Sequence, residues 1–449
     1  MNHHLLQRYG APVPRYTSYP TAPHFHAAVN AASYRQWLGR IGDGDSLSLY
    51  LHVPFCARMC WYCGCHTKVV RQYQPIAHYA ALLAAEVGLV AEAIPASPRV
   101  TQVHWGGGTP TMLAPDDFQR LIAELRGRFR FAEDAEIAVE IDPRGLSDDK
   151  LAALAEAGVT RASLGVQDFT PKVQQAINRI QPYSMTAAAV ERLRAAGIAA
   201  INLDLMYGLP HQGVEDAVRT AELAAELAPD RLAVFGYAHV PWMKRHQRLI
   251  DEAALPGAAA RLEQSEAMAA RLVECGYRRI GLDHFALPFD AMARAQATGR
   301  LRRNFQGYST DEAGTLLGFG ASSIGALDEG YVQNAVPFGA YGKAIRDGAL
   351  AVTRGIALSP DDRLRRAVIE RLMCALAVDL AEVARKCGQA PADVSAELAA
   401  LAPLQEDGLV ALDGQRIAVT ETGRPFVRAV CARFDRYLAS GQARHSRAV

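Results

Sequence analysis

The chain has 449 residues, of which 50% are hydrophobic and 21% are charged, a composition typical of globular proteins with a large buried core. Its 48 Lys and Arg residues against 47 Asp and Glu residues leave a net charge of +1. Nucleic-acid binders usually carry a basic excess or a basic stripe, so we expect no nucleic-acid partner. The N-terminus has no apolar signal-peptide core, and no run of about 18 apolar residues occurs. We therefore expect a cytoplasmic protein that does not enter a membrane.

Residues 1–45 are rich in Pro, Tyr and His and are interpreted as an N-terminal arm. From residue 46 to about 240, short apolar runs alternate with amphipathic segments. This alternation predicts strands joined by crossover helices in a parallel sheet. Six units are fewer than the eight that close a TIM barrel, so we expect an α/β fold with a partial (β/α)6 barrel. The predicted strands are residues 46–53, 101–105, 136–141, 161–166, 201–207 and 231–237.

The barrel with a C-terminal extension is assigned to residues 46–355, and the extension contains several glycine-rich segments. A new helix is predicted at Ser359-Pro360-Asp361-Asp362, because a cap residue, a first-turn proline and two acids follow one another. Asp413-Gly414 in GLVALDGQRIAVT predicts a hairpin turn. Residues 356–449 are therefore predicted to form a small, mostly helical, winged-helix-like domain.

Four of the eight cysteines lie within FCARMCWYCGC (55–65), spaced Cys56-x3-Cys60-x2-Cys63-x-Cys65. A disulfide framework is disfavoured in a reducing compartment. A zinc knuckle usually brings two Cys-x2-Cys pairs separated by a longer gap, and ferredoxins use other spacings. The residues leave a zinc site open as an alternative, but the spacing favours a [4Fe-4S] cluster held by three thiolates.

Two motifs resemble those of the radical S-adenosylmethionine (SAM) enzymes. The first is Cys56-x3-Cys60-x2-Cys63 with Tyr62 before the last cysteine, and the second is HWGGGTPT (104–111) after the next strand. The resemblance implies that Cys56, Cys60 and Cys63 bind the cluster and that SAM chelates its fourth, open iron. Cys65 is then not a ligand. The expected contacts of this first SAM are Tyr50, Tyr62, Gly107, Gly108, Thr109 and Glu140.

A narrower resemblance covers residues 15 to about 435. The segments RYTSYPTAPHF (15–25), VEIDPR (139–144), NLDLMYGLP (202–210) and RNFQGY (303–308) are similar to those of the oxygen-independent (anaerobic) coproporphyrinogen III oxidases. That family implies oxidative decarboxylation of two propionates of coproporphyrinogen III to vinyl groups, which yields protoporphyrinogen IX for haem synthesis. The resemblance also implies a 5′-deoxyadenosyl radical as the hydrogen-abstracting species and a low-potential electron donor. We expect a monomer.

The same resemblance implies further site residues. A second SAM is expected near Gln167, Arg179, Asp204, Ala238 and Ile324. The candidate catalytic residues are Tyr50 beside the first SAM, Cys65 near the cofactor and substrate, and Phe305 and Gln306 in contact with substrate or SAM. Arg15 and Arg303 are candidates for binding the substrate's propionates, and His66 is an alternative metal ligand.

Three alternatives remain at this point. A radical SAM haem chaperone would bind haem without decarboxylating it, a radical SAM methyltransferase would also use two SAM molecules, and a zinc protein would hold no cluster. Cys65 and RYTSYP favour the decarboxylase over the chaperone. We also expect the arm and the C-terminal domain to cover the open barrel as lids.

Overall fold

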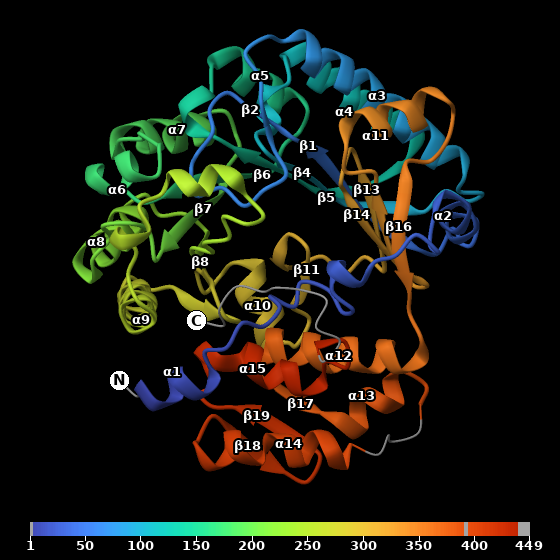
Figure 1. Ribbon diagram of the computed structural model, residues 1–449. Helices are drawn as coiled ribbons and strands as arrows, with labels where there is room; N and C mark the ends of the chain where they lie inside the picture. Colours follow the sequence, from blue (N-terminus) through green and yellow to red (C-terminus); the bar gives the residue numbers. More distant parts are fainter. Residues whose placement is uncertain (1–2, 390–393, 439–449) are drawn as a thin grey trace.

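A twelve-stranded sheet forms the larger part of the protein (Figure 1). The structure is a computed structural model that describes residues 3–389 and 394–438. The central strands run parallel in chain order, as the sequence predicted for a partial barrel. They are β1 Ser46–Val53, β4 Arg99–Gly107, β5 Arg130–Ile141, β6 Arg161–Gln167, β7 Ala200–Tyr207 and β8 Arg231–Gly236.

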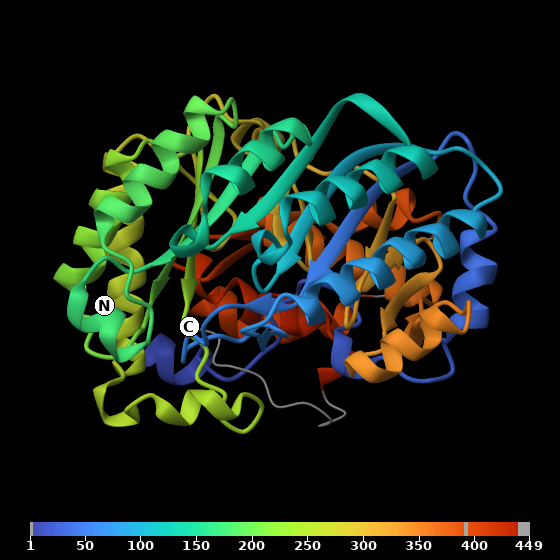
Figure 2. The ribbon, with the colours of Figure 1, turned by 90° about the horizontal axis from the view of Figure 1, so that it is seen from above.

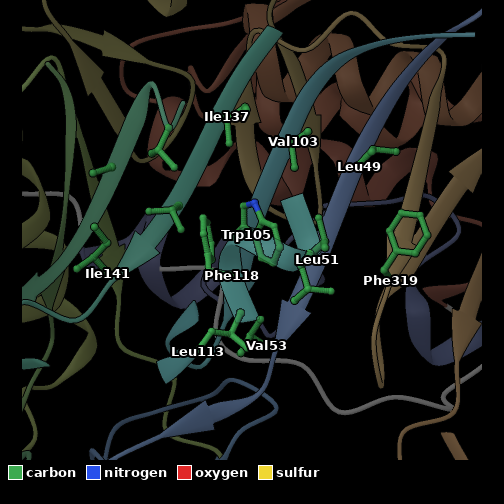
Figure 3. Packing of buried hydrophobic residues seen from close by; sticks show 14 of the residues in the cluster. Leu49, Leu51, Val53, Val103, Trp105, Leu113, Phe118, Ile137, Ile141 and Phe319 are labelled. Atoms are coloured by element: carbon green, nitrogen blue, oxygen red, sulfur yellow. The ribbon is translucent and has the colours of Figure 1, made fainter. Parts of the chain in front are cut away.

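Helices between these strands cover the outer face of the sheet (Figures 1 and 2). In α4, Phe118, Leu121, Ile122 and Leu125 are buried, and their spacing of three and four places them on one helix face. Trp105 of β4 packs against Phe118 with ring centroids 4.6 Å apart (Figure 3). These helices are α3 Gln74–Glu92, α4 Pro115–Arg128, α5 Asp148–Glu156, α6 Pro171–Ala176, α7 Tyr183–Ala195 and α8 Val214–Glu226.

The two faces of the sheet differ in polarity because successive side chains of a strand point to opposite faces. Along β1, Leu47, Leu49 and Leu51 are buried in the core shared with the helices. Tyr50 and His52, in the intervening positions, therefore point to the inside of the barrel. The inner face is consequently polar at the carboxyl ends of the strands, where barrel enzymes place their chemistry.

Six further strands extend this sheet at both edges, and the sequence analysis missed them. β13 pairs parallel with β1, and the other five are antiparallel to their neighbours. They are only three to six residues long, and glycines occur in β13, β14, β15 and β16, so no period-2 alternation is visible. They are β9 Arg278–Ile280, β10 His284–Ala286, β13 Thr315–Phe319, β14 Ile324–Leu327, β15 Gly330–Asn334 and β16 Val352–Ala357.

The remaining helices and strands of residues 1–355 lie in the arm, in the cysteine loop or in the C-terminal extension of the barrel. They are the helices α2 Ala31–Leu38, α9 Ala258–Glu274, α10 Ala291–Ala297 and α11 Phe338–Arg346, the hairpin β11 Arg302–Asn304 and β12 Gly307–Ser309, and the pair β2 Phe55–Cys56 and β3 Lys68–Val69. Short 3-10 helices are η1 Ala22–His24, η2 Pro110–Met112, η3 Pro143–Gly145, η4 Arg245–Leu249, η5 Glu252–Ala254, η6 Arg424–Phe426 and η7 Ala432–Phe434.

The C-terminal part begins at the predicted helix start. Ser359 caps α12, since its side chain accepts a hydrogen bond from the backbone of Asp362, and the Asp413-Gly414 turn joins β18 to β19 as predicted. We propose that this part is the separate winged-helix-like domain expected from the sequence; residues 390–393 and 439–449 lie outside the described residues. Its elements are α12 Pro360–Ala375, β17 Ala377–Asp379, α13 Leu380–Lys386, α14 Ser395–Glu406, β18 Val410–Asp413, β19 Arg416–Val419 and α15 Val427–Cys431.

The first helix of the N-terminal arm lies against this C-terminal domain (Figure 1). Leu5 and Tyr9, in α1 His3–Tyr9, are buried together with Leu372 and Phe426. Tyr9 also donates a hydrogen bond of 2.6 Å to Asp407. The arm and the domain therefore bury apolar surface against each other, which holds the arm in place.

Among the described residues, one helix, α3, has the length and apolar composition to cross a membrane, and half of it is buried inside the protein. Ile76, Leu83 and Val87 of this helix belong to the main core. Its position against the sheet accounts for its apolar composition.

The core of the C-terminal domain predicts a strong effect for Leu372→Ala. Leu372 is 0% exposed, so the substitution leaves a cavity that costs about 2 to 5 kcal/mol of unfolding free energy. Urea denaturation monitored by circular dichroism measures this loss. Val273→Ala, at a position of α9 that is 48% exposed, is the control and should change stability by less than about 0.5 kcal/mol. Equal effects of both substitutions would contradict the described packing.

Candidate active site

The cysteine loop follows β1 at the carboxyl end of the sheet. The short strands β2 and β3 close its base, where Lys68 N donates to Pro54 O at 2.7 Å and Val70 N donates to Cys56 O at 3.1 Å. Cys60 is buried, and Cys56 and Cys63 are half-buried. The two ends of the loop are thus hydrogen-bonded to each other, and the cysteines lie on a loop that is closed at its base.

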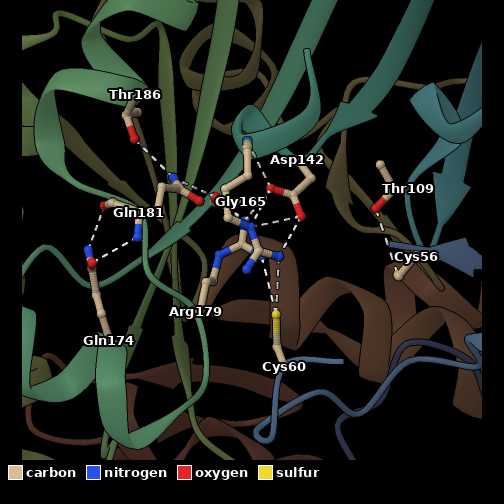
Figure 4. Close-up of polar contacts among 10 residues, drawn as sticks. Cys56, Cys60, Thr109, Asp142, Gly165, Gln174, Arg179, Gln181 and Thr186 are labelled. Atoms are coloured by element: carbon tan, nitrogen blue, oxygen red, sulfur yellow. Dashed lines mark hydrogen bonds and ion pairs between the residues drawn. The ribbon is translucent and has the colours of Figure 1, made fainter. Parts of the chain in front are cut away.

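Hydrogen-bond donors surround two of these thiols (Figure 4). Thr109 Oγ1 lies 3.7 Å from Cys56 Sγ. Arg144 Nη2 and Arg179 Nη1 lie 3.4 and 3.5 Å from Cys60 Sγ. Positive charges and donors beside a thiol stabilise its thiolate, which is the form that binds metal.

The remaining two thiols of the loop interact with each other. A hydrogen bond from the Cys65 thiol, together with the charges of His246 and Lys244, lowers the pKa of Cys63 to about 6 despite its burial. The same hydrogen bond raises the pKa of Cys65 well above its usual value. The hydrogen bond thus favours the thiolate form of Cys63 and the thiol form of Cys65.

Burial raises the pKa of Cys56 to about 11, a penalty that coordination removes because a metal deprotonates its thiol ligand. Within residues 3–389 and 394–438, no three His, Cys, Asp or Glu side chains converge as the ligands of one metal ion would.

Side chains distant in sequence hold the backbone of the loop. Gln247 Nε2 donates to Tyr62 O, and Lys244 Nζ donates to Cys65 O, both at 2.8 Å. His246 Nε2 donates to Cys63 O at 2.7 Å. Asn178 Nδ2 donates to Met59 O at 2.8 Å. These four residues were not predicted from the sequence, because none of them lies in a recognisable local motif.

The glycine-rich segment lies directly beside the loop. A Cβ at Gly108 would come within 2.7 Å of Phe55 O and 3.0 Å of Cys56 Sγ. A Cβ at Gly106 would come within 2.8 Å of Glu140 Oε1. The absence of a side chain at these glycines is therefore required for this close approach, and it leaves room for a ligand beside the backbone.

Polar side chains from neighbouring strands meet on the inner face. Glu140 of β5 accepts hydrogen bonds from Gly107 N at 3.1 Å and from His104 Nε2 at 3.2 Å. Burial raises its pKa, but the hydrogen bond and charge of His104 outweigh burial and lower it. Burial and the charge of Glu140 raise the pKa of Asp204, on β7, to about 6. One carboxylate is thus firmly ionised and the other titrates near neutral pH.

Arg179 connects the cysteine loop to β6 (Figure 4). It is 6% exposed, and its Nη2 donates to Gly165 O at 2.6 Å and lies 3.5 Å from Asp142 Oδ1. Gln167, at the end of β6, has a φ of 72°, a left-handed conformation often found at functional sites. A Cβ at Gly165 would lie 3.0 Å from Gln167 Nε2 and 3.1 Å from Arg179 Nη2, so Gln167 and Arg179 border the same space, next to Cys60.

The structure brings the other predicted residues into two groups. Ala238 lies beside the cysteine loop, because Gln247 Nε2 also donates to Ala238 O at 3.2 Å. Phe305 and Ile324 pack instead with Phe25 and Tyr331 under the arm. Gln306 is next to Phe305, and its backbone N donates to Asn304 Oδ1 at 2.9 Å.

His66 lies at the edge of the first group. Its backbone O accepts a hydrogen bond from His52 Nε2 at 3.1 Å, and its ring lies 5.9 Å from that of Phe338.

A cysteine loop and a glycine-rich segment on the first two strands of a partial barrel define the radical SAM class. The family model described as Radical SAM superfamily matches residues 50–224, and that described as HemN C-terminal domain matches residues 358–426. Two curated relatives are named oxygen-independent coproporphyrinogen III oxidase. The one from Bradyrhizobium diazoefficiens is 53% identical over 97% of both chains, and the one from Paracoccus denitrificans is 45% identical over 99% of both chains.

A solved structure, of coproporphyrinogen III oxidase from Escherichia coli described as a radical SAM enzyme, superposes with a TM-score of 0.90. It is 41% identical, and the match covers 94% of this chain and 97% of that chain. The chain belongs to the family of oxygen-independent coproporphyrinogen III oxidases.

The contact at Gly108 predicts that Gly108→Ala disturbs the cluster site. The added methyl group must displace Phe55 O and Cys56 Sγ, and overpacking of this kind costs about 1 to 3 kcal/mol. We expect less iron per chain after anaerobic reconstitution. Gly127→Ala is the control, because a Cβ at Gly127 meets nothing within 4 Å; full iron content in both variants would argue against the described packing.

Proposed function

We propose that the protein catalyses the oxygen-independent oxidative decarboxylation of two propionate side chains of coproporphyrinogen III, which yields the divinyl product protoporphyrinogen IX. The observation that carries this proposal is the arrangement of Cys56, Cys60 and Cys63 beside Gly108 and Glu140 at the carboxyl end of the sheet. Family membership supplies the substrate.

Cys56, Cys60 and Cys63 would hold a [4Fe-4S] cluster through three irons and leave the fourth for SAM. When bound and reduced, the cluster and SAM together supply the radical that abstracts hydrogen from the substrate. Cys65 would keep its proton beside Cys63 and would not bind iron. This assignment leaves a thiol next to the reacting groups.

The chain's own residues would bind and orient the first SAM. Gly107 and Gly108 have no side chains and so allow a ligand to approach closely, and Glu140 offers an ionised carboxylate to the ammonium group of its methionine end. Tyr50, whose OH lies 3.0 Å from His52 Nδ1, would border the same space. Thr109 would support the site by donating to Cys56.

A second SAM would occupy the polar group around Arg179, Gln167, Asp204 and Ala238. Each propionate loses one hydrogen atom from its β-carbon, carbon dioxide and one electron when it becomes a vinyl group. Two propionates thus require two hydrogen-abstracting equivalents, which fits two SAM molecules. Phe305, Gln306 and Ile324, under the arm, would contact the substrate or the second SAM.

The arm would narrow the opening of the barrel. It contacts β16 at one edge of the sheet, where His26 N donates to Gly355 O at 2.8 Å. It also contacts the end of β8, where Arg15 Nη2 donates to Gly236 O at 3.2 Å. A wall across the opening would exclude water and stray hydrogen donors from a reactive radical.

We further propose that the enzyme acts as a monomer in the reducing cytoplasm and receives electrons from a low-potential donor. Thiols stay available for iron in that compartment.

One anaerobic turnover assay tests the proposed function. Reconstituted protein is incubated with SAM, a low-potential reductant and coproporphyrinogen III, and the porphyrins are separated after oxidation. We expect the divinyl product from wild type and none from Cys56→Ala. Cys65→Ala is the matched control for iron binding and should keep the full iron content, because the proposed cluster does not use this thiol.

Two results of this assay would overturn parts of the proposal. Cleavage of SAM without a vinyl product would exclude the decarboxylase and favour the haem chaperone. Loss of iron from Cys65→Ala to the same degree as from Cys56→Ala would exclude the three-cysteine ligand set.

The second SAM site predicts a change in stoichiometry for Arg179→Met. Equilibrium dialysis against labelled SAM should count two molecules per chain in wild type and one in the variant, because the guanidinium and its charge are lost from the site. Arg192→Met, which removes the surface pair of Arg192 with Asp148 at 2.5 Å, should leave the count unchanged. A count of one in wild type would exclude a second site.

A further inference from the structure

Three arginines from three parts of the chain lie together at the carboxyl end of the barrel. Arg15 belongs to the arm, Arg303 to β11 and Arg428 to α15. Arg303 Nη2 donates to Arg15 O at 3.4 Å. The helix α12 packs against both β11 and α15, which brings Arg303 and Arg428 to the same side of the C-terminal domain. Burial and the charges of Arg15 and Arg303 lower the pKa of Arg428 to about 10, in keeping with three guanidinium groups at one site.

The positive charge in this site exceeds the negative charge that faces it. Asp283 is the carboxylate whose charge acts on all three arginines. Although burial raises its pKa, the hydrogen bond from His284 and the nearby arginine charges lower it to about 2, so Asp283 is ionised. One negative charge against three positive ones leaves a surplus of positive charge. Arg15 is exposed, but Arg428 is buried, and an unbalanced charge is costly there unless an anion balances it.

The side chain of Arg303 has unused donors. Its guanidinium stacks on Tyr308, 4.4 Å from the ring centroid, which fixes its orientation. In the described part of the chain, no group accepts a hydrogen bond from its buried Nε and Nη1 atoms. A buried donor without a partner costs free energy that a bound acceptor restores.

The arginine site is close to the cysteine loop. Arg15 binds the carbonyl of Gly236, the last residue of β8. Ala238 is two residues farther along the chain, a distance of at most about 7 Å. Its backbone O accepts a hydrogen bond from Gln247, and Gln247 also donates to Tyr62 O in the cysteine loop. A ligand of porphyrin size can therefore reach both places at once.

We propose that Arg15, Arg303 and Arg428 bind the carboxylates of the tetrapyrrole substrate and that Arg428 brings the C-terminal domain into the substrate site. The forked guanidinium group binds carboxylates through two parallel hydrogen bonds, and several such groups suit a ligand with several propionates. This inference rests on the proposed function for the identity of the ligand. SAM is the other source of a carboxylate, and the experiment separates the two.

The test measures binding without turnover. Full-length reconstituted wild type, Arg428→Met and Arg303→Lys are titrated with coproporphyrin III, the stable oxidised form of the substrate with the same propionates, and with its neutral tetramethyl ester. We expect Arg428→Met to bind coproporphyrin III at least about 10-fold more weakly, as loss of a charged hydrogen bond does, and to bind the ester like wild type. Affinity for SAM should not change.

Arg365→Met is the matched control. Arg365 is 7% exposed and lies in α12 of the same domain. Its guanidinium pairs with Glu397 at 2.7 Å and Asp361 at 2.9 Å and donates to Phe434 O at 3.0 Å, all within the C-terminal domain. Its affinity for coproporphyrin III should equal that of wild type.

Arg303→Lys keeps the positive charge and loses the forked guanidinium group, so it tests the site if Arg428→Met does not fold. We expect this variant to bind coproporphyrin III more weakly and to have an unchanged circular dichroism spectrum. Wild-type affinity in a folded Arg428→Met or Arg303→Lys protein would overturn the inference, and so would a loss of SAM affinity in place of porphyrin affinity. A wild-type protein that binds coproporphyrin III through these arginines but forms no vinyl product would overturn the proposed function and leave this inference standing.

Discussion

The site depends on the hydrogen bonds that hold the backbone of the cysteine loop in position. A loop that presents three thiols to a cluster has few partners of its own for its backbone carbonyls, and unpaired buried carbonyls are costly. Lys244, His246 and Gln247 supply these partners from the segment after β8. The segment after β8 is therefore hydrogen-bonded to the loop that follows β1. The loop takes this shape only when the barrel brings the two segments together.

The inner face of the sheet adds an electrostatic constraint. His104 and Gly107 N donate to Glu140 and keep it ionised, and its charge in turn contributes to the raised pKa of Asp204. Two carboxylates in one buried space thus differ in protonation because their hydrogen-bond partners differ. Glu140 carries a negative charge suited to an ammonium group, while Asp204 is protonated at a higher pH than an ordinary aspartate.

The sequence predicted the parallel strands closely because each is followed by an amphipathic helix. β1 has the predicted bounds, and the other five agree within a few residues except β5, which starts six residues earlier. The edge strands were missed because short, glycine-rich strands owe their pairing to neighbours that are far away in sequence. The same reason applies to Gln247 and Arg428, since neither lies in a local motif and only the folded chain brings them to the site.

We propose that the arm closes the barrel as a fixed wall and does not move as a flap. The sheet ends at β16 on one side and at β9 beside β10 and β8 on the other, and an incomplete barrel leaves a gap between these edges. The arm spans that gap from His26 at β16 to Arg15 at β8, while Leu5 and Tyr9 are buried in the core of the C-terminal domain. Swinging the arm away would expose that core, at a cost of about 1.5 to 3 kcal/mol for each large apolar side chain. The packing of Leu5 and Tyr9 in the C-terminal domain consequently helps to hold Arg15 at the end of β8. The C-terminal domain thus determines the position of Arg15 in the arm as well as that of Arg428 in α15.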